Sequence, residues 1–188
     1  MSKLPSMILR PATTTDLPRM WEMILQAKAQ MYRENKQQWD ESYPLPVHLQ
    51  ADIDKGYAYV LENEGKVIAY GAIVFDGEPA YDSIDGNWLS EQPYVVLHRL
   101  AVADEVKRQG VAVRFFQEII ALALSKNIHS FKVDTNYDNF YMHKVLDKCG
   151  FTYCGIIHYP RGDRWGMKNY SFSFGRIFSS KISLRIMR

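Results

Sequence analysis

The most informative run of the chain is Lys107-Arg108-Gln109-Gly110-Val111-Ala112. It follows a nearly continuous apolar stretch at 94–102, typical of a buried strand, and leads into an amphipathic stretch at 111–125, typical of a helix. A glycine-centred turn at a helix start presents free backbone N–H groups and the positive end of the helix dipole. Because a pyrophosphate is the usual occupant of such a turn, the run predicts a phosphate-bearing ligand here.

The elements around this run indicate a mixed α/β fold. The helix at 111–125 joins the apolar stretch to a strand at 131–134, so these two strands are predicted to be parallel. Asn63-Glu64-Gly65 predicts a hairpin turn, and Gly150 is expected to end a helix at 139–149. The other predicted elements are a strand at 7–10, a helix from 14–16 to about residue 35, a short helix at 47–55, hairpin strands at 57–62 and 66–75, and a closing antiparallel pair at 151–159 and 167–174. We therefore predict one α/β domain over residues 1–174, a central mixed sheet flanked by helices, followed by a basic tail at 175–188.

Length and composition indicate an ordinary soluble globular protein. The chain has 188 residues, of which 47% are hydrophobic and 23% charged, and its net charge is +2. This charge is too small to imply a nucleic-acid partner, and no apolar run approaches membrane-spanning length. Cys149 and Cys154 fit neither a metal site nor a disulfide framework, and their apolar neighbours favour free thiols in a reducing compartment. Since the start carries no signal-peptide pattern, we expect a cytoplasmic protein without a metal, bound to neither nucleic acid nor membrane.

One family matches the run together with its surroundings. The run is not a P-loop, because no Gly-Lys-Ser/Thr follows, and it lacks the three glycines of a dinucleotide-binding turn. Lys107-x-x-Gly110-x-Ala112 instead resembles the acetyl-CoA motif of the GCN5-related N-acetyltransferase (GNAT) family, Gln/Arg-x-x-Gly-x-Gly/Ala, with lysine in its first position. Further family elements, in the same order, are Ile8-Leu9-Arg10-Pro11-Ala12-Thr13, Leu100-Ala101-Val102, the strand at 131–135, Asn139 and Cys149-Gly150-Phe151. The resemblance spans about residues 7–174.

The resemblance implies that acetyl-CoA is the co-substrate. The amides from Lys107 to Ala112 would hold its pyrophosphate, and Gly110 would let the backbone approach without a Cβ. The strand end at Leu100, Ala101 and Val102 would bond the pantetheine arm as a neighbouring strand does, and a backbone amide there would polarise the thioester carbonyl. Asn139 would hold an amide of the cofactor; the alternative is that it is an ordinary helix N-cap.

The catalytic groups are less well defined by the sequence. Family members commonly place the general acid on a tyrosine in the helix after the asparagine, at the position of Leu146. Tyr141 on the same helix is the candidate replacement; the alternative is that it packs on the pantetheine or shields the site. His98 is the candidate base, because a histidine ordinarily titrates near the pH where a base is useful; a hydrogen-bonded core histidine is the alternative. Strand alternation predicts that His98 shares a face with Leu100, and that Arg99 points to the opposite face and pairs with an acid.

Aromatic residues in two loops indicate the acceptor site. Trp39 and Tyr43 in one loop and Trp88 in the long connection at 76–93 have acidic neighbours, and together they would suit a cationic amine. The alternative is that these rings pack under the loops. The basic tail at 175–188 could touch a membrane or an acidic partner, but such a terminus more often frays or packs on a neighbouring subunit, as in a homodimer.

The sequence thus predicts an N-acetyltransferase that moves an acetyl group from acetyl-CoA to a primary amine. The acceptor would be a small molecule or an exposed amino group, and the amine would attack the thioester directly. Cys149 and Cys154 are not expected to act as nucleophiles. Two alternatives stay open: a non-catalytic acyl-CoA-binding module or sensor on the same fold, favoured by Leu146, and a nucleic-acid or membrane-associated protein that acts through the basic tail.

Overall fold

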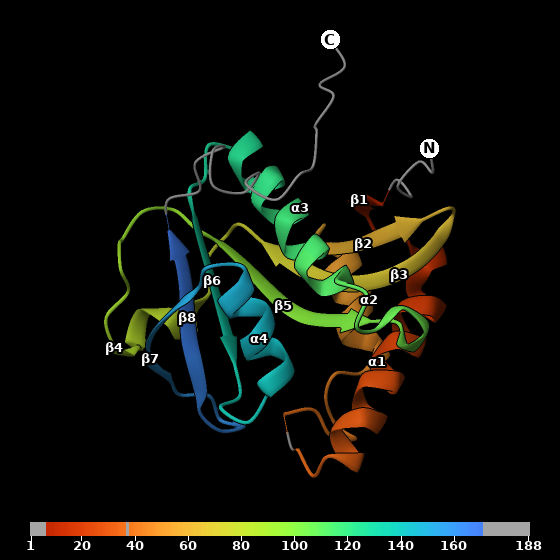
Figure 1. The fold of residues 1–188 in the computed structure, drawn as a ribbon, viewed down its shortest axis with the longest axis horizontal. Helices are drawn as coiled ribbons and strands as arrows, with labels where there is room; N and C mark the ends of the chain where they lie inside the picture. Colours follow the sequence, from red (N-terminus) through yellow and green to blue (C-terminus); the bar gives the residue numbers. More distant parts are fainter. Residues whose placement is uncertain (1–6, 37, 171–188) are drawn as a thin grey trace.

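The fold is an eight-stranded mixed sheet with helices on both faces (Figure 1). The computed structural model describes residues 7–36 and 38–170. The strands are β1 (Ile8–Pro11), β2 (Ala58–Asn63), β3 (Lys66–Val74), β4 (Asp85–Gly86), β5 (Val95–Val102), β6 (Ser130–Thr135), β7 (Thr152–Ile157) and β8 (Arg164–Tyr170). The α-helices are α1 (Leu17–Arg33), α2 (Pro46–Asp54), α3 (Val111–Ser125) and α4 (Phe140–Lys148). Short 3-10 segments lie at Thr14–Asp16, Pro79–Ser83 and Asp104–Val106.

Two apolar layers hold the sheet between the helices. Phe115, Phe116 and Ile119 on the buried stripe of α3 pack with Leu146 of α4 against the face of the sheet that includes β3, β5 and β6. On the other face, α1 and α2 cover the half of the sheet formed by β2 and β3. Figure 1 shows α3 and α4 in front of the sheet and α2 behind it. The amphipathic stripe predicted for α3 therefore faces the core.

The sheet opens at its centre. The strand order is β1-β2-β3-β5-β6-β8-β7-β4, and in the described residues every neighbouring pair is antiparallel except β5 and β6. The parallel ladder between β5 and β6 is short: Val95 pairs with Phe131 and Val96 with Lys132, and the pairing stops there. Beyond these residues the two strands diverge, which leaves a gap between their carboxyl ends (Figure 1).

A bulge in β5 lies beside this gap. Ala72 of β3 pairs with His98 and Tyr70 pairs with Ala101, so Arg99 and Leu100 together face the single residue Gly71. Arg99 adopts a left-handed φ of 56°, as the extra residue of a bulge can do. Gly71 opposite it packs tightly, because a Cβ there would lie 2.7 Å from Leu97 Cδ1 and 3.0 Å from the Phe115 ring, so these side chains would have to shift.

The bulge corrects the expected alternation along β5. Leu100 packs in the same apolar cluster as Leu97, on the face covered by α3, whereas His98 contacts Glu78 on the far side of the strand. His98 and Leu100 therefore do not share a face, and His98 and Arg99 both line one cavity. The prediction failed because one inserted residue reverses the order of faces after it.

Most other predicted elements are confirmed within a few residues. The parallel crossover through α3, the hairpin of β2 and β3, the short helix α2 and the antiparallel pair of β7 and β8 are all present. The closing strand begins at Arg164 rather than 167, because Arg164 already pairs with Ile157. The end of that predicted strand at 171–174 and the basic tail at 175–188 lie outside the described residues. In residues 7–36 and 38–170, no helix is both long and apolar enough to cross a membrane.

Candidate active site

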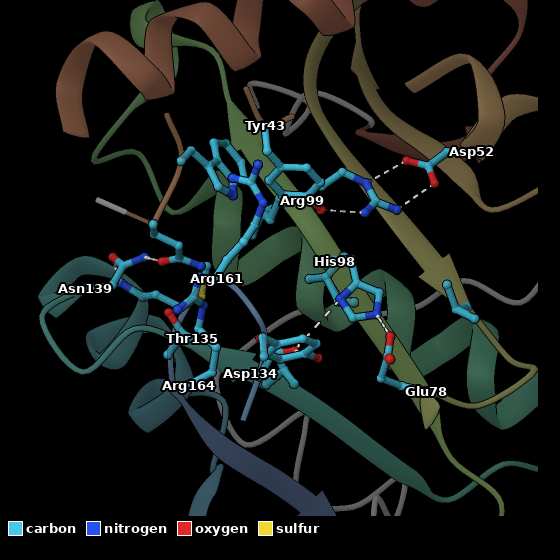
Figure 2. A pocket seen from close by; sticks show the side chains of 18 of the residues that line it. Tyr43, Asp52, Glu78, His98, Arg99, Asp134, Thr135, Asn139, Arg161 and Arg164 are labelled. Atoms are coloured by element: carbon cyan, nitrogen blue, oxygen red, sulfur yellow. Dashed lines mark hydrogen bonds and ion pairs between the residues drawn. The ribbon is translucent and has the colours of Figure 1, made fainter. Parts of the chain in front are cut away.

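The gap between β5 and β6 leads into a cavity of about 650 Å³. Its lining comes from the loop before α2, the start of the long connection at 76–93, the diverging ends of β5 and β6, the start of α4 and the turn between β7 and β8. Figure 2 shows side chains from these separate segments converging on one space. The cavity is therefore built by tertiary contacts around the opening of the sheet.

The glycine turn follows the carboxyl end of β5 and is not among the residues that line the cavity. Gly110 is the N-cap of α3 with φ 81°, and Arg108 before it is also left-handed at φ 65°. The amide of Arg114 makes the first helical bond, to the Gly110 carbonyl, so the amides of the preceding helical residues have no intrahelical partner. A Cβ on Gly110 would meet nothing within 4 Å, and Arg108, Gln109 and Gly110 are exposed. The turn is thus an open concave array of N–H groups, as an anion site requires.

The Lys107 side chain takes a different direction. Its Nζ donates to Gln30 Oε1 at 2.7 Å and pairs with Asp104, so it is tied to α1 rather than free over the turn. Any phosphate contact at this position would come from the backbone.

Asn139 lies at the start of α4, beside the cavity. Its Oδ1 accepts from the Met142 amide at 3.2 Å, which is the ordinary N-cap bond, and its Nδ2 donates to Gln38 Oε1 at 3.2 Å. Asn139 is therefore the N-cap of α4, and its contact with an amide of the cofactor stays a prediction. Close by, Thr135 Oγ1 and Asn136 Oδ1 are buried and have no hydrogen-bond partner in the described chain, which is compatible with a polar ligand in the gap.

His98 lies on the wall of the cavity between two acids. Its Nε2 lies 3.0 Å from Glu78 Oε2, and its Nδ1 lies 3.9 Å from Asp134 Oδ1 (Figure 2). The bond with His98 lowers the pKa of Glu78, against the opposing effect of burial. Because an ionised carboxylate can only accept, Nε2 carries a proton, and in the neutral imidazole Nδ1 would then hold the lone pair. The pair can therefore present a base at Nδ1.

Two tyrosines donate hydrogen bonds to Asp134. Tyr81 donates to Asp134 Oδ1 at 2.7 Å and Tyr159 donates to the same oxygen at 3.3 Å. Burial raises the pKa of both phenols, and the Asp134 carboxylate raises them further, so both stay protonated as donors. Asp134 thus accepts hydrogen bonds from two phenols beside His98.

Glu78 and Asp134 were not identified from the sequence. Asp134 ends a strand that was predicted to be parallel, and ligands bind at the carboxyl ends of parallel strands, so that signal could have found it. Glu78 lies in the long irregular connection, where no pattern separates it from the other acids.

Arg99 forms the opposite wall. Its Nε donates to Asp52 Oδ2 at 2.7 Å and its Nη2 to Asp52 Oδ1 at 2.6 Å, which confirms the prediction that it pairs with an acid. Its Nη1 donates to the Tyr43 hydroxyl at 2.8 Å, and Tyr70 donates to Asp52 from the core. The network fixes α2 and the loop before it against the bulge in β5.

The mouth of the cavity is closed by a contact between two loops. Arg161, in the turn between β7 and β8, donates to Ser42 Oγ at 2.6 Å and lies 3.3 Å from both Asp40 oxygens. Its guanidinium also lies 5.3 Å from the centre of the Tyr43 ring. Trp39 and Tyr43 line the cavity, so two of the three expected acceptor residues are brought together.

The remaining expected residues lie elsewhere. Trp88 lines a separate cavity of about 400 Å³, and its Nε1 donates to the Tyr81 carbonyl at 2.8 Å. Tyr141 is 53% exposed, its ring lies 4.9 Å from Lys36 Nζ, and it is not among the residues that line the main cavity. Leu146 is fully buried in the core. The assignment of Tyr141 as the general acid stays a prediction, because its position alone does not test that role.

Neither cysteine belongs to the cavity wall. Burial raises the pKa of Cys149 to about 11 and also raises that of Cys154. Both thiols therefore stay protonated at neutral pH, and neither position offers a thiolate nucleophile.

Comparisons with known proteins agree with this geometry. A family model described as the acetyltransferase (GNAT) family matches residues 21–151. A GNAT-family acetyltransferase from Streptococcus agalactiae is 29% identical, with a TM-score of 0.81 over 89% of this chain and 96% of that chain. A putative acetyltransferase from Staphylococcus aureus is 25% identical, with a TM-score of 0.66 over 87% of this chain and 98% of that chain. An aminoglycoside acetyltransferase in complex with coenzyme A, 19% identical, shares the fold with a TM-score of 0.64 over 88% of this chain and 95% of that one. None of the curated proteins compared matches the chain.

A sheet opened between two parallel strands, with an exposed helix N-terminus at one end and an acid–histidine pair inside, defines an enzyme of the N-acetyltransferase class. The chain belongs to the acetyltransferase (GNAT) family, whose members use acetyl-CoA. The family, fold class and enzyme class predicted from the sequence are therefore confirmed.

Proposed function

We propose that this protein transfers an acetyl group from acetyl-CoA to the primary amine of an acceptor, with His98 as the general base. The observation that carries the proposal is that β5, which places His98 beside Glu78 on the cavity, leads at its carboxyl end into the turn at Gly110. A donor held by this turn and along β5 would bring its acyl group toward the base that deprotonates the amine.

The donor side supports acetyl-CoA. The amides of 108–112 suit a pyrophosphate. The edge of β5 that faces β6 has no pairing with β6 beyond Val96, so the amides of a pantetheine arm could bond to it as an added strand does. Leu100, Ala101 and Val102 lie along this edge. When bound, acetyl-CoA supplies a thioester carbon that an amine can acylate.

The acceptor side supports direct attack. His98 Nδ1 would take a proton from the incoming ammonium, and Asp134, 3.9 Å away, would hold the positive charge before that transfer. The neutral amine then bonds to the thioester carbon, the carbon–sulfur bond breaks, and the nitrogen gives its second proton to the departing sulfur, so that the products are the amide and coenzyme A as the thiol. Trp39 and Tyr43 would contact the rest of the acceptor.

The test is a thiol-release assay with acetyl-CoA and a broad panel of primary amines. Replacing His98→Gln should lower kcat/KM by about 100-fold or more, because a positioned base contributes that much to proton transfer. His129→Gln is the matched control, since His129 is exposed and lies outside the cavity. Equal activity of the two variants would exclude His98 as the base.

A sensor is the second candidate function, because Leu146 puts no hydroxyl where the family commonly has a tyrosine. Tight binding of acetyl-CoA without amine-dependent thiol release across the panel would favour it over the transferase.

A further inference from the structure

Arg164, the first residue of β8, is a cation of the cavity wall that has no carboxylate partner in the described part of the chain. The residue is only 9% exposed. Its Nη1 donates to the carbonyls of Gly162 at 3.1 Å and Asp163 at 3.0 Å, and within residues 7–36 and 38–170 its Nε and Nη2 make no hydrogen bond. One edge of the Arg164 guanidinium therefore faces accessible space in the cavity without a bond to the described part of the chain.

The other guanidinium groups of the cavity are already neutralised. Arg99 is bonded bidentately by Asp52, and Arg161 is held by Asp40 and Ser42. Burying a charge is costly unless an opposite charge accompanies it. Arg164 is thus the position in this cavity where a ligand anion would supply the missing counter-charge.

The cavity also carries negative charge. Glu78 and Asp134 flank His98, and in the view of Figure 2 Asp134 lies between His98 and Arg164. An ammonium group fits between His98 and Asp134, as the proposed function requires. The site therefore shows two poles, one for an amine and one for an anion.

We propose that the acceptor is a small amine whose carbon skeleton carries a carboxylate, an amino acid in the broad sense, with Arg164 as the residue that binds the carboxylate. This inference rests on the proposed function and specifies its substrate class. A planar carboxylate matches the free Nε and Nη2 edge of a guanidinium. A phosphate dianion is disfavoured, because Glu78 and Asp134 lie in the same cavity and would repel the second charge.

The test compares matched pairs of acceptors in the thiol-release assay. Each pair differs only in the carboxylate: γ-aminobutyrate with propylamine, leucine with isoamylamine, and phenylalanine with phenethylamine, together with aminopropylphosphonate. With kcat/KM expressed per neutral amine, the carboxylate member should be preferred by about ten- to hundredfold in at least one pair, the range expected for a hydrogen-bonded ion pair. Equal or better use of the decarboxylated amine in every pair, or preference for the phosphonate, would overturn the inference.

Variants of Arg164 connect the preference to this residue. Arg164→Gln should remove the preference by raising KM for the carboxylate acceptor with little change in kcat, because the anion contact is the same in the ground and transition states. Arg164→Lys keeps the charge without the planar fork and should retain part of it. Arg33→Gln, an exposed arginine in the last turn of α1, is the matched control and should keep the full preference. A preference unchanged in Arg164→Gln would contradict the assignment.

A binding measurement separates this inference from the proposed function. Calorimetry of γ-aminobutyrate against the protein saturated with coenzyme A requires no turnover. If γ-aminobutyrate binds and Arg164→Gln weakens that binding at least tenfold, the anion site is supported. If no thiol is released in the same case, the transferase proposal is removed while the anion site stands. Absence of both binding and turnover for every amino acid tested would overturn the anion site.

Discussion

The pair of Asp52 and Arg99 gives the sharpest prediction for stability. Asp52 is 4% exposed. It accepts hydrogen bonds from Nε and Nη2 of Arg99, at 2.7 Å and 2.6 Å, and a third from the hydroxyl of Tyr70. The substitution Asp52→Asn removes the charge but keeps the size. It leaves a buried guanidinium without its counter-charge and turns one acceptor into an NH₂ donor that faces other donors.

The expected cost is large for a single side chain. Removing one partner of a buried ion pair costs about 3–5 kcal/mol. The Arg99 side chain keeps 16% exposure and its bond to Tyr43, so a loss about 1 kcal/mol smaller, about 2–4 kcal/mol, is expected here. Since a domain is stable by only about 5–15 kcal/mol, the change should be obvious in an unfolding curve.

The assay is urea unfolding followed by tryptophan fluorescence. With a urea dependence of about 1–3 kcal/mol per molar, the midpoint of Asp52→Asn should fall by about 1–2 M. Glu22→Gln is the control: it breaks an exposed pair with Arg19 and should cost less than about 1 kcal/mol. Adding Arg99→Met to Asp52→Asn should recover part of the loss, because no buried charge then remains unpaired. A loss for Asp52→Asn no larger than that of Glu22→Gln would refute this account of the wall.

Three further predictions concern the base, the turn and a buried lysine. Glu78→Gln should lower kcat by about 10- to 100-fold, because an amide no longer fixes the proton on His98 Nε2; this is a part of what a positioned base contributes. An unchanged kcat in the thiol-release assay would argue against the pair of His98 and Glu78. Gly110→Val should raise KM for acetyl-CoA and cost about 1–2 kcal/mol, because φ is 81° while the space around a Cβ is open; Gly110→Ala should show the same direction with a smaller effect, and KM equal to wild type in both would remove the turn from the donor site. Burial lowers the pKa of Lys168 to about 8 from 10.5, so the folded state binds fewer protons than the unfolded chain between these values. Stability should therefore rise by at most about 3 kcal/mol as the pH increases from 8 to 10.5, and Lys168→Met should flatten that part of the curve; parallel curves from urea unfolding would contradict the shift.

The turn expected to hold the donor could be located from the sequence because its residues are contiguous. Lys107 to Ala112 form a turn and a helix start, and their contact with acetyl-CoA stays a prediction. The structure adds that Lys107 itself is bound to Gln30 of α1. This pairing joins residues far apart in the sequence and leaves no trace in the motif.

The acceptor end could be predicted only in part. His98, Trp39 and Tyr43 were identified and lie on one cavity, but Trp88, an equally plausible aromatic residue, packs beneath Tyr81 instead. Trp39, Tyr43 and Trp88 are all aromatic and lie in loops, so the sequence does not separate them. Only the path of each loop in the folded chain decides which ring reaches the cavity. Glu78 was missed for the same reason.

The order of apolar runs and turn residues was enough to establish the mixed sheet, its parallel crossover and the family, because periodicity and turn chemistry are local. The tertiary structure alone placed His98 between Glu78 and Asp134 and left Arg164 without a carboxylate partner in the described part of the chain. A one-residue bulge at Arg99 reverses the faces of β5, and the parallel ladder stops after Val96. Both features depend on contacts between distant strands, and such contacts set which side chains meet in the cavity.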